Sequence, residues 1–168
     1  MLYIFQRLTK EKRQGRAAVP GKMLNGSTMA VVLPDELKAA IDSSRADGFP
    51  ILWASVDDSG QPTIAIYGST HVHSDHELAI WLRTEGRGFL SRTGKNAKVF
   101  GWFRNTATNV ACQIVGEARR VDDPATRDRV YNESPEPERK MDEAKAGVAV
   151  IVDIVRVIQR GQVIASRD

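Results

Sequence analysis

The chain gathers all three of its histidines into one short run, residues 70–76, which reads Thr-His-Val-His-Ser-Asp-His. Imidazole and carboxylate groups are zinc ligands, and a structural zinc site needs about four ligands while a catalytic site needs about three and a water molecule. No histidine follows His76, and the one cysteine, Cys112, lies in an apolar run. The sequence therefore predicts no metal site. The run is interpreted as a β-strand with His71 and His73 on one face, followed by a turn at residues 74–76.

The same run resembles the zinc signature T-H-x-H-x-D-H of the metallo-β-lactamase superfamily. The resemblance stops at the run, because the further ligands of a two-zinc site are missing and 168 residues are few for the four-layered fold of that superfamily. A zinc hydrolase that uses this run is kept as the least favoured function.

The length and composition are those of one globular domain behind a basic leader. Of 168 residues, 42% are hydrophobic and 27% charged, and the formal net charge is +3. Residues 1–28 hold six basic residues against Glu11, which is +5, so the remaining body carries −2. We expect a disordered leader over residues 1–28, a domain over residues 29–168 with Met29 or Met23 as the natural start, and neither a nucleic-acid nor a membrane partner.

The leader and the cysteine content also bear on location. The apolar run at the start of the chain is interrupted by Arg7 and Lys10, so it is too short for a signal peptide or a membrane span. A single cysteine permits no internal disulfide, which suits a cytoplasmic protein. Cys112 has no activating neighbour in the sequence, so we expect a packed, unreactive thiol.

The residue pattern predicts strands joined by tight turns, with few helices. An amphipathic helix begins near Pro34 and ends by Gly48, and a brief helix is expected within residues 86–94. Helices also open at Asp123-Pro124 and Ser134-Pro135, each with an N-cap followed by proline. The predicted strands are residues 51–56, 63–67, 70–73, 77–83, 98–103, 109–121 with a bulge or bend at Gly116, 148–157 and 163–164. This order favours a mainly β, antiparallel fold of six or seven strands closed into a barrel.

The ordered set of these pieces over about residues 33–160 resembles the pyridoxamine 5'-phosphate oxidase-like, flavin-binding split-barrel family. The pieces are residues 33–37, 52–62, 77–84, 88–90, 116–124, 129–131, 134–136 and 147–153. The resemblance implies a homodimer of split barrels. It also implies FMN, or the related deazaflavin F420 or haem, at the subunit interface.

The resemblance places a cofactor site on two segments. Arg83 and Thr84 at a strand end, with the glycine-rich turn through Arg87 and Gly88, would offer a guanidinium, a hydroxyl and backbone N–H groups to the flavin phosphate. Residues 67–70 would run beside the isoalloxazine, where Gly68 permits close approach. The implied cofactor-binding residues are Tyr67, Gly68, Ser69, Thr70, Trp81, Arg83, Thr84, Arg87, Gly88 and Phe89.

One position departs from the family. A lysine is often found six residues after the threonine that matches Thr84, and here that residue is Leu90. Either Arg87 or Arg92 replaces it, or the affinity is weaker, or the cofactor differs.

The sequence therefore favours an FMN-dependent oxidoreductase acting on a small molecule of unknown identity, with no acid, base or nucleophile assigned. The main alternative is a non-catalytic binder of flavin, F420 or haem, with His71 and His73 as candidate haem ligands.

Overall fold

The computed structural model describes residues 31–84 and 88–167. The expectations for the leader, Met23, Met29 and Arg87 lie outside these ranges. In chain order the elements are α1 (Asp35–Ser43), β1 (Leu52–Val56), β2 (Pro62–Ile66), β3 (His71–Val72), β4 (Glu77–Leu82), α2 (Phe89–Thr93), β5 (Lys98–Asn105), β6 (Val110–Val121), α3 (Pro124–Glu133), α4 (Glu136–Lys140), β7 (Val148–Gln159) and β8 (Gln162–Ser166).

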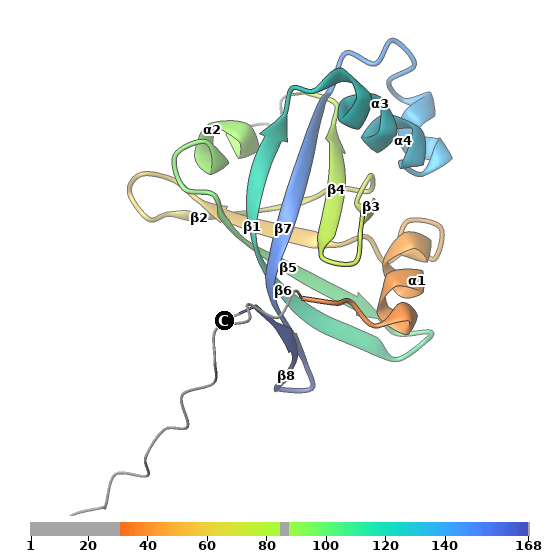
Figure 1. Cartoon of the computed structure of the whole chain (residues 1–168), viewed down its shortest axis with the longest axis vertical. Coiled ribbons are helices and arrows are strands. Elements are labelled where there is room, and N and C mark those ends of the chain that lie inside the picture. Colours follow the sequence, from red (N-terminus) through yellow and green to blue (C-terminus); the bar gives the residue numbers. More distant parts are fainter. Residues whose placement is uncertain (1–30, 85–87, 168) are drawn as a thin grey trace, which may run out of the picture.

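The strands form one antiparallel sheet that curls into a split barrel. Seven strands follow one another in the order β2-β1-β5-β6-β7-β4-β3, and β8 is added beside β7. Figure 1 shows the long strands β6 and β7 crossing the molecule, with α3 and α4 beside β4 and α1 at one end of the β5–β6 hairpin. The expected antiparallel split barrel is confirmed.

The barrel is not closed in the part of the chain that the structure describes, so the expectation of full closure was wrong. The sheet path ends at β2 and at β3, and no pairing joins these two strands. The link between them, residues 67–70, is hydrogen-bonded to β4 and β1 instead. The Ser69 hydroxyl forms hydrogen bonds with the backbone of Trp81 in β4, and the Thr70 hydroxyl accepts a hydrogen bond from the Trp53 indole in β1.

Strands β4 and β7 are buried on both faces because a helix covers their outer side. Their inward residues join the barrel core, while their outward residues form a second core with α3. The second core consists of Ala79, Trp81, Val121, Val130, Tyr131, Ala149 and Ile151. β5 lies at the other extreme and alternates strictly between exposed and buried residues. These two cores fix the end of β4, where the candidate site lies.

Local signals account for most element boundaries. Asp123 caps α3 by accepting a hydrogen bond from the Thr126 N–H at 2.8 Å, and proline follows at the first helical position. The pairing of β6 with β7 shifts register between Val115 and Gly116, which confirms the expected bulge. The predicted cap of α4 was wrong: Ser134 donates its hydroxyl to the Val130 carbonyl at 2.8 Å, and Pro135 is the N-cap without a side-chain bond.

Candidate functional site

A cleft of about 650 Å³ lies between the end of β4, the edge strand β2 and the helices α2 and α4. Its volume falls within the roughly 300–1,000 Å³ of small-molecule sites. Its lining residues are Arg45, Pro50, Thr63, Ile64, Ala65, Ile66, Tyr67, Gly68, Ser69, Trp81, Leu82, Arg83, Thr84, Arg92 and Glu138. Three arginines against one glutamate give these side chains a net charge of +2. The cleft is therefore suited to an anionic ligand.

The structure brings together part of both segments that the resemblance places at a cofactor. The residues of that set that line the cleft are Tyr67, Gly68, Ser69, Trp81, Arg83 and Thr84, whereas Thr70, Gly88 and Phe89 do not line it. Ser69 joins the segments, because its hydroxyl donates to the Trp81 carbonyl at 2.7 Å and accepts from the Trp81 N–H at 3.1 Å. Thr70 is buried, donates to the Tyr67 carbonyl and accepts from the Trp53 indole. These hydroxyls hold the link in place, so the link offers mainly its backbone to a ligand.

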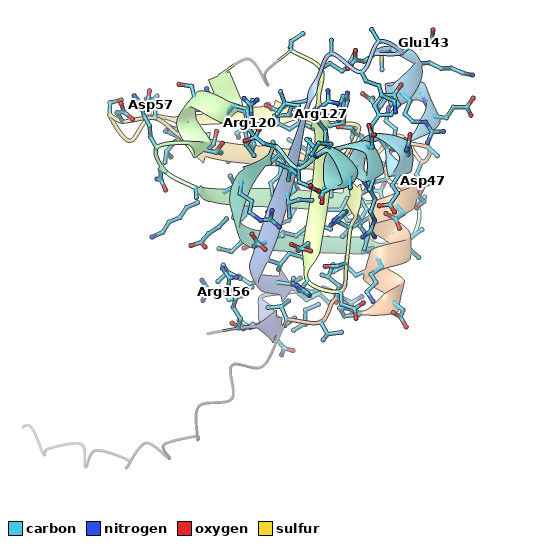
Figure 2. The ribbon with its side chains drawn as sticks, turned by 45° about the horizontal axis from the view of Figure 1, so that its top comes forward. Asp47, Asp57, Arg120, Arg127, Glu143 and Arg156 are labelled. Atoms are coloured by element: carbon cyan, nitrogen blue, oxygen red, sulfur yellow. The ribbon has the colours of Figure 1, made fainter. Side chains whose placement is uncertain are left out.

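Trp81 borders the cleft, but its indole belongs to the second core. The residue is 2% exposed, and its indole N–H donates to Asp142 at 2.8 Å. Arg127 lies over the ring at 4.9 Å and Tyr131 packs edge-on at 5.0 Å, with Arg127 labelled in Figure 2. Burial acts to raise the pKa of Asp142, but hydrogen bonds from Trp81 and from two backbone N–H groups lower it overall. Trp81 therefore stays beside an ionised carboxylate and positions the end of β4.

One end of the cleft is built around a buried carboxylate, Glu138 of α4. Its Oε1 accepts from Arg45 Nε at 2.9 Å, and its Oε2 lies 3.5 Å from Arg83 Nη2. A Cβ on Gly68 would lie 2.4 Å from Glu138 Oε1 and 2.8 Å from Arg45 Cδ. Glycine at residue 68 thus makes room for this ion pair. Sequence reasoning missed Arg45 and Glu138, which lie 93 residues apart and show no local signal.

The other end of the cleft carries Arg92 of α2. Arg92 Nε donates to the Ser55 hydroxyl at 2.8 Å, which fixes the guanidinium beside β1. Gly88 precedes α2 with a φ of 91°, and a Cβ there would lie 2.9 Å from Arg92 Nη1. Leu90, at the position where the family often has lysine, packs against the barrel core. Of the two arginines proposed to replace that lysine, Arg92 lines the cleft and Arg87 lies outside the described residues.

Phe89 and Cys112 are core residues. Phe89 is fully buried and packs edge-on against Tyr67 at 5.3 Å, so it supports a residue of the cleft wall and does not itself line the cleft. Cys112 is 1% exposed, and burial raises the pKa of its thiol to about 12. The expectation of an unreactive, packed thiol is confirmed.

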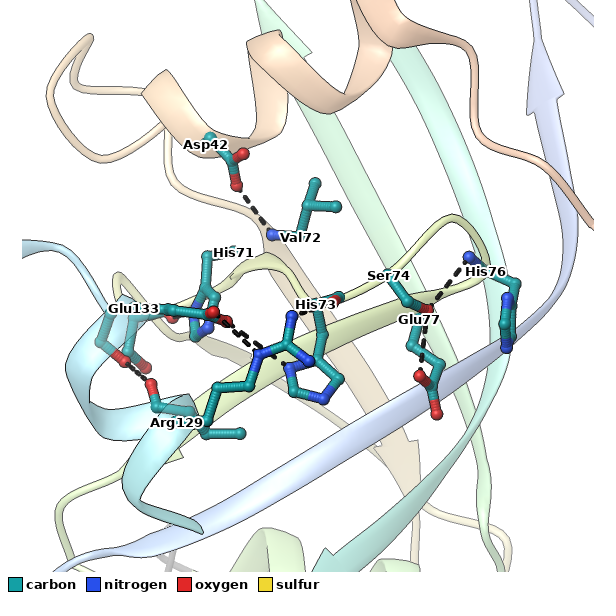
Figure 3. A network of polar contacts seen from close by, with 12 residues as sticks. Asp42, His71, Val72, His73, Ser74, His76, Glu77, Arg129 and Glu133 are labelled. Atoms are coloured by element: carbon teal, nitrogen blue, oxygen red, sulfur yellow. Dashed lines mark hydrogen bonds and ion pairs between the residues drawn. The ribbon is translucent and has the colours of Figure 1, made fainter. Parts of the chain in front are cut away.

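The histidine run lies away from the cleft, beneath α3. Figure 3 shows His71 and His73 on the side of Glu133, with His76 beyond the turn. His71 is 3% exposed and its Nδ1 lies 2.8 Å from the Ser69 carbonyl, while Arg129 donates to the His73 carbonyl at 2.9 Å. Burial lowers the pKa of both rings, and the described residues hold no group of three potential metal ligands. Neither histidine lines the cleft.

Comparison with known proteins gives a fold and no close relative. No protein-family model and no curated protein matches the chain. Among solved structures, an FMN-binding protein of Syntrophomonas wolfei has a TM-score of 0.59 at 14% identity, over 76% of this chain and 88% of its own. A protein of Clostridium acetobutylicum related to general stress protein 26, of the pyridoxinephosphate oxidase family, has a TM-score of 0.54 at 14% identity, over 79% and 95%. An F420 reductase has a TM-score of 0.55 at 16% identity, over 75% and 98%.

At these identities the similarity establishes the fold. The chain has the split-barrel fold that the sequence predicted, and the similarity extends over nearly the whole length of the neighbouring structures. Within the described part of the chain, no helix has the length and apolar character that a membrane crossing requires.

Proposed function

We propose that this chain is an FMN-dependent oxidoreductase that acts on a small molecule and holds its cofactor in the 650 Å³ cleft. The observation that carries the proposal is a cleft with a net charge of +2 that is lined by most of residues 67–70 and by Arg83 and Thr84, which the family resemblance assigns to a flavin. A flavin phosphate carries a charge of about −2 at neutral pH, which matches that excess. The FMN-binding and F420 reductase neighbours support a flavin or a deazaflavin in this fold.

The residues fit an FMN molecule with its phosphate toward α2. Arg92 is fixed by Ser55 and faces the cleft, and the hydroxyls of Thr63 and Thr84 line the same space. Residues 67–70 would flank the flavin ring with their backbone, held by Ser69 and Thr70. Bound FMN would supply the hydride or electron transfer. The protein would bind the phosphate, orient the ring and exclude water from one side of it.

We propose further that the protein is a homodimer with the cofactor at the subunit interface. Ile64 and Ile66 of β2 are 66% and 60% exposed, and Phe100 and Trp102 of β5 are 38% and 37% exposed. The strand register aligns these residues across β1, because Leu52 pairs with both Ile66 and Trp102. This apolar face continues into the cleft, whose lining includes Ile64 and Ile66. A second copy over the face would bury it and close the cleft.

The single free cysteine, which is buried, supports a cytoplasmic location as part of the same proposal.

Two measurements test the function. Protein incubated with FMN and passed through gel filtration should keep flavin bands near about 370 and 450 nm, in competition with F420 and haem. Reconstituted protein should then oxidise a reduced nicotinamide under aerobic conditions. FMN retained without turnover would indicate a carrier rather than an oxidoreductase, and retention of F420 or haem in place of FMN would replace the cofactor.

A further inference from the structure

The cleft has two cationic ends, and in the proposed function the FMN phosphate would occupy only the end at Arg92. Arg92 is bonded to Ser55, which pairs with Thr63 in the β1–β2 register. Arg45 and Glu138 lie against Gly68, five residues further along the same lining segment. β2 is extended from Thr63 to Ile66, and at about 3.3 Å per residue this part of the wall alone separates the two ends by roughly 10 Å. The end at Gly68 is therefore free for a second anionic group.

Arg45 is oriented to receive such a group. Glu138 accepts a hydrogen bond from Nε of Arg45 alone. Among residues 31–84 and 88–167, the Arg45 guanidinium makes no other hydrogen bond or ion pair. The two terminal nitrogens of a guanidinium form a planar fork that binds both oxygens of a carboxylate or phosphate. The Arg45 side chain is 37% exposed and lines the cleft, so the fork is accessible from it.

Glu138 and Gly68 hold this arrangement. Glu138 is 8% exposed at its side chain and neutralises one charge of the Arg45 and Arg83 pair, which leaves a net +1 at this end of the cleft. Gly68 lets the pair close against residues 67–70 because it has no Cβ. In the proposed function this segment flanks the flavin ring. A group bound at Arg45 would therefore lie beside the ring rather than beside the phosphate.

We propose that Arg45 is a substrate-binding residue, and that the cluster of Arg45, Glu138 and Arg83 receives the carboxylate or phosphate of an anionic substrate next to the flavin ring. This inference rests on the proposed function. It defines the substrate class as a small molecule with an oxyanion at one end and its reactive part over the cofactor.

The test uses the full chain loaded with FMN, with inorganic phosphate and acetate as probes and glycerol as the neutral control. Binding is measured by isothermal titration calorimetry and by ³¹P line broadening. Arg45→Gln should raise the dissociation constant for phosphate about tenfold or more, with FMN affinity changed by less than about threefold. Arg119→Gln is the matched control, because Arg119 is likewise a partly exposed arginine held by carboxylates, Glu77 and Asp153, but at the opposite end of β4. The control should leave both affinities unchanged.

Other results separate this inference from the proposed function. Unchanged phosphate binding in Arg45→Gln, or a loss of FMN affinity as large as the loss of phosphate affinity, would overturn the subsite. If wild-type protein does not retain FMN, the proposed function fails, and the same phosphate titration on the purified protein decides the anion site alone. If Arg45→Gln does not fold, phenylglyoxal modification of the wild-type protein tests whether Arg45 binds the anion. Phosphate should protect Arg45 in peptide mass maps, and equal modification with and without phosphate would overturn the inference.

Discussion

Replacing Arg92 by alanine should weaken FMN binding more than any other single change at the phosphate end of the cleft. The Ser55 hydroxyl fixes Arg92 Nε at 2.8 Å, so the guanidinium is oriented before the ligand arrives and loses little entropy on binding. Loss of one charge-assisted contact costs about 1.5–3 kcal/mol. This corresponds to a roughly 10- to 150-fold higher dissociation constant for FMN.

The assay is a titration of FMN fluorescence with purified Arg92→Ala protein, beside Arg119→Ala. Arg119 is a comparable control because it is 51% exposed and paired with two carboxylates, and it lies outside the cleft. Thermal melts of both variants check that the fold is retained. A change in FMN affinity below about threefold for Arg92→Ala, in protein that melts like the wild type, would refute the assignment of the phosphate to this end.

Four further predictions follow from the same contacts. Arg83→Ala should raise the dissociation constant of the FMN-loaded protein for inorganic phosphate by about threefold or more, less than Arg45→Gln, because Arg83 is 42% exposed and is shared with Glu138; unchanged phosphate binding in isothermal titration calorimetry would remove it from the anion site. Gly68→Ala should destabilise the fold by about 1–3 kcal/mol in urea unfolding, because its Cβ would lie 2.4 Å from Glu138 Oε1; equal stability would show that the pair moves freely. Burial lowers the pKa of His71 below its ordinary 6.5, so as pH falls through 6.5 the unfolded chain binds a proton that the folded protein does not, and stability falls toward acid. His71→Gln should therefore flatten the decline of unfolding free energy between pH 6.5 and about 5, where one proton contributes at most about 1.4 kcal/mol per pH unit and His73, whose pKa is also lowered, adds to the same decline. Trp102→Glu, on the exposed face of β5, should convert a dimer to a monomer in sedimentation velocity, and a wild-type monomer would contradict the proposed interface.

Features encoded locally were predictable from the sequence. The β1–β2 hairpin follows from two β-prone runs around a turn, and the bulge of β6 follows from Gly116, where a Cβ would lie 2.7 Å from Val152 Cγ1. Arg83 and Thr84 could be placed at a strand end from the sequence, whereas residues 67–70 were assigned to the site only through the family resemblance. Their meeting in one cleft depended on the family resemblance, which supplied the order of the strands.

Features that depend on long-range packing were not predictable. Ser134-Pro135 repeats the pattern of Asp123-Pro124, yet Ser134 donates back to Val130 because the chain arrives there from α3 rather than from a strand. In the sequence, nothing distinguishes Glu138 from the other acidic residues around a short polar helix. Its burial follows from the packing of α4 over residues 67–70, and no local sequence pattern predicts that contact. The same holds for Arg45, whose partner lies 93 residues away.

The central claim is that Arg92, at the α2 end of the cleft, holds the phosphate of FMN, and comparison of FMN with riboflavin tests it most directly. The two ligands share the flavin ring and differ by the phosphate, so their dissociation constants isolate that contact. Charge-assisted contacts of the phosphate with Arg92 and with the hydroxyls of Thr63 and Thr84 predict that FMN binds about 100-fold or more tightly than riboflavin in a fluorescence titration at low salt. Equal affinity for the two flavins, or no binding of either, would contradict the claim.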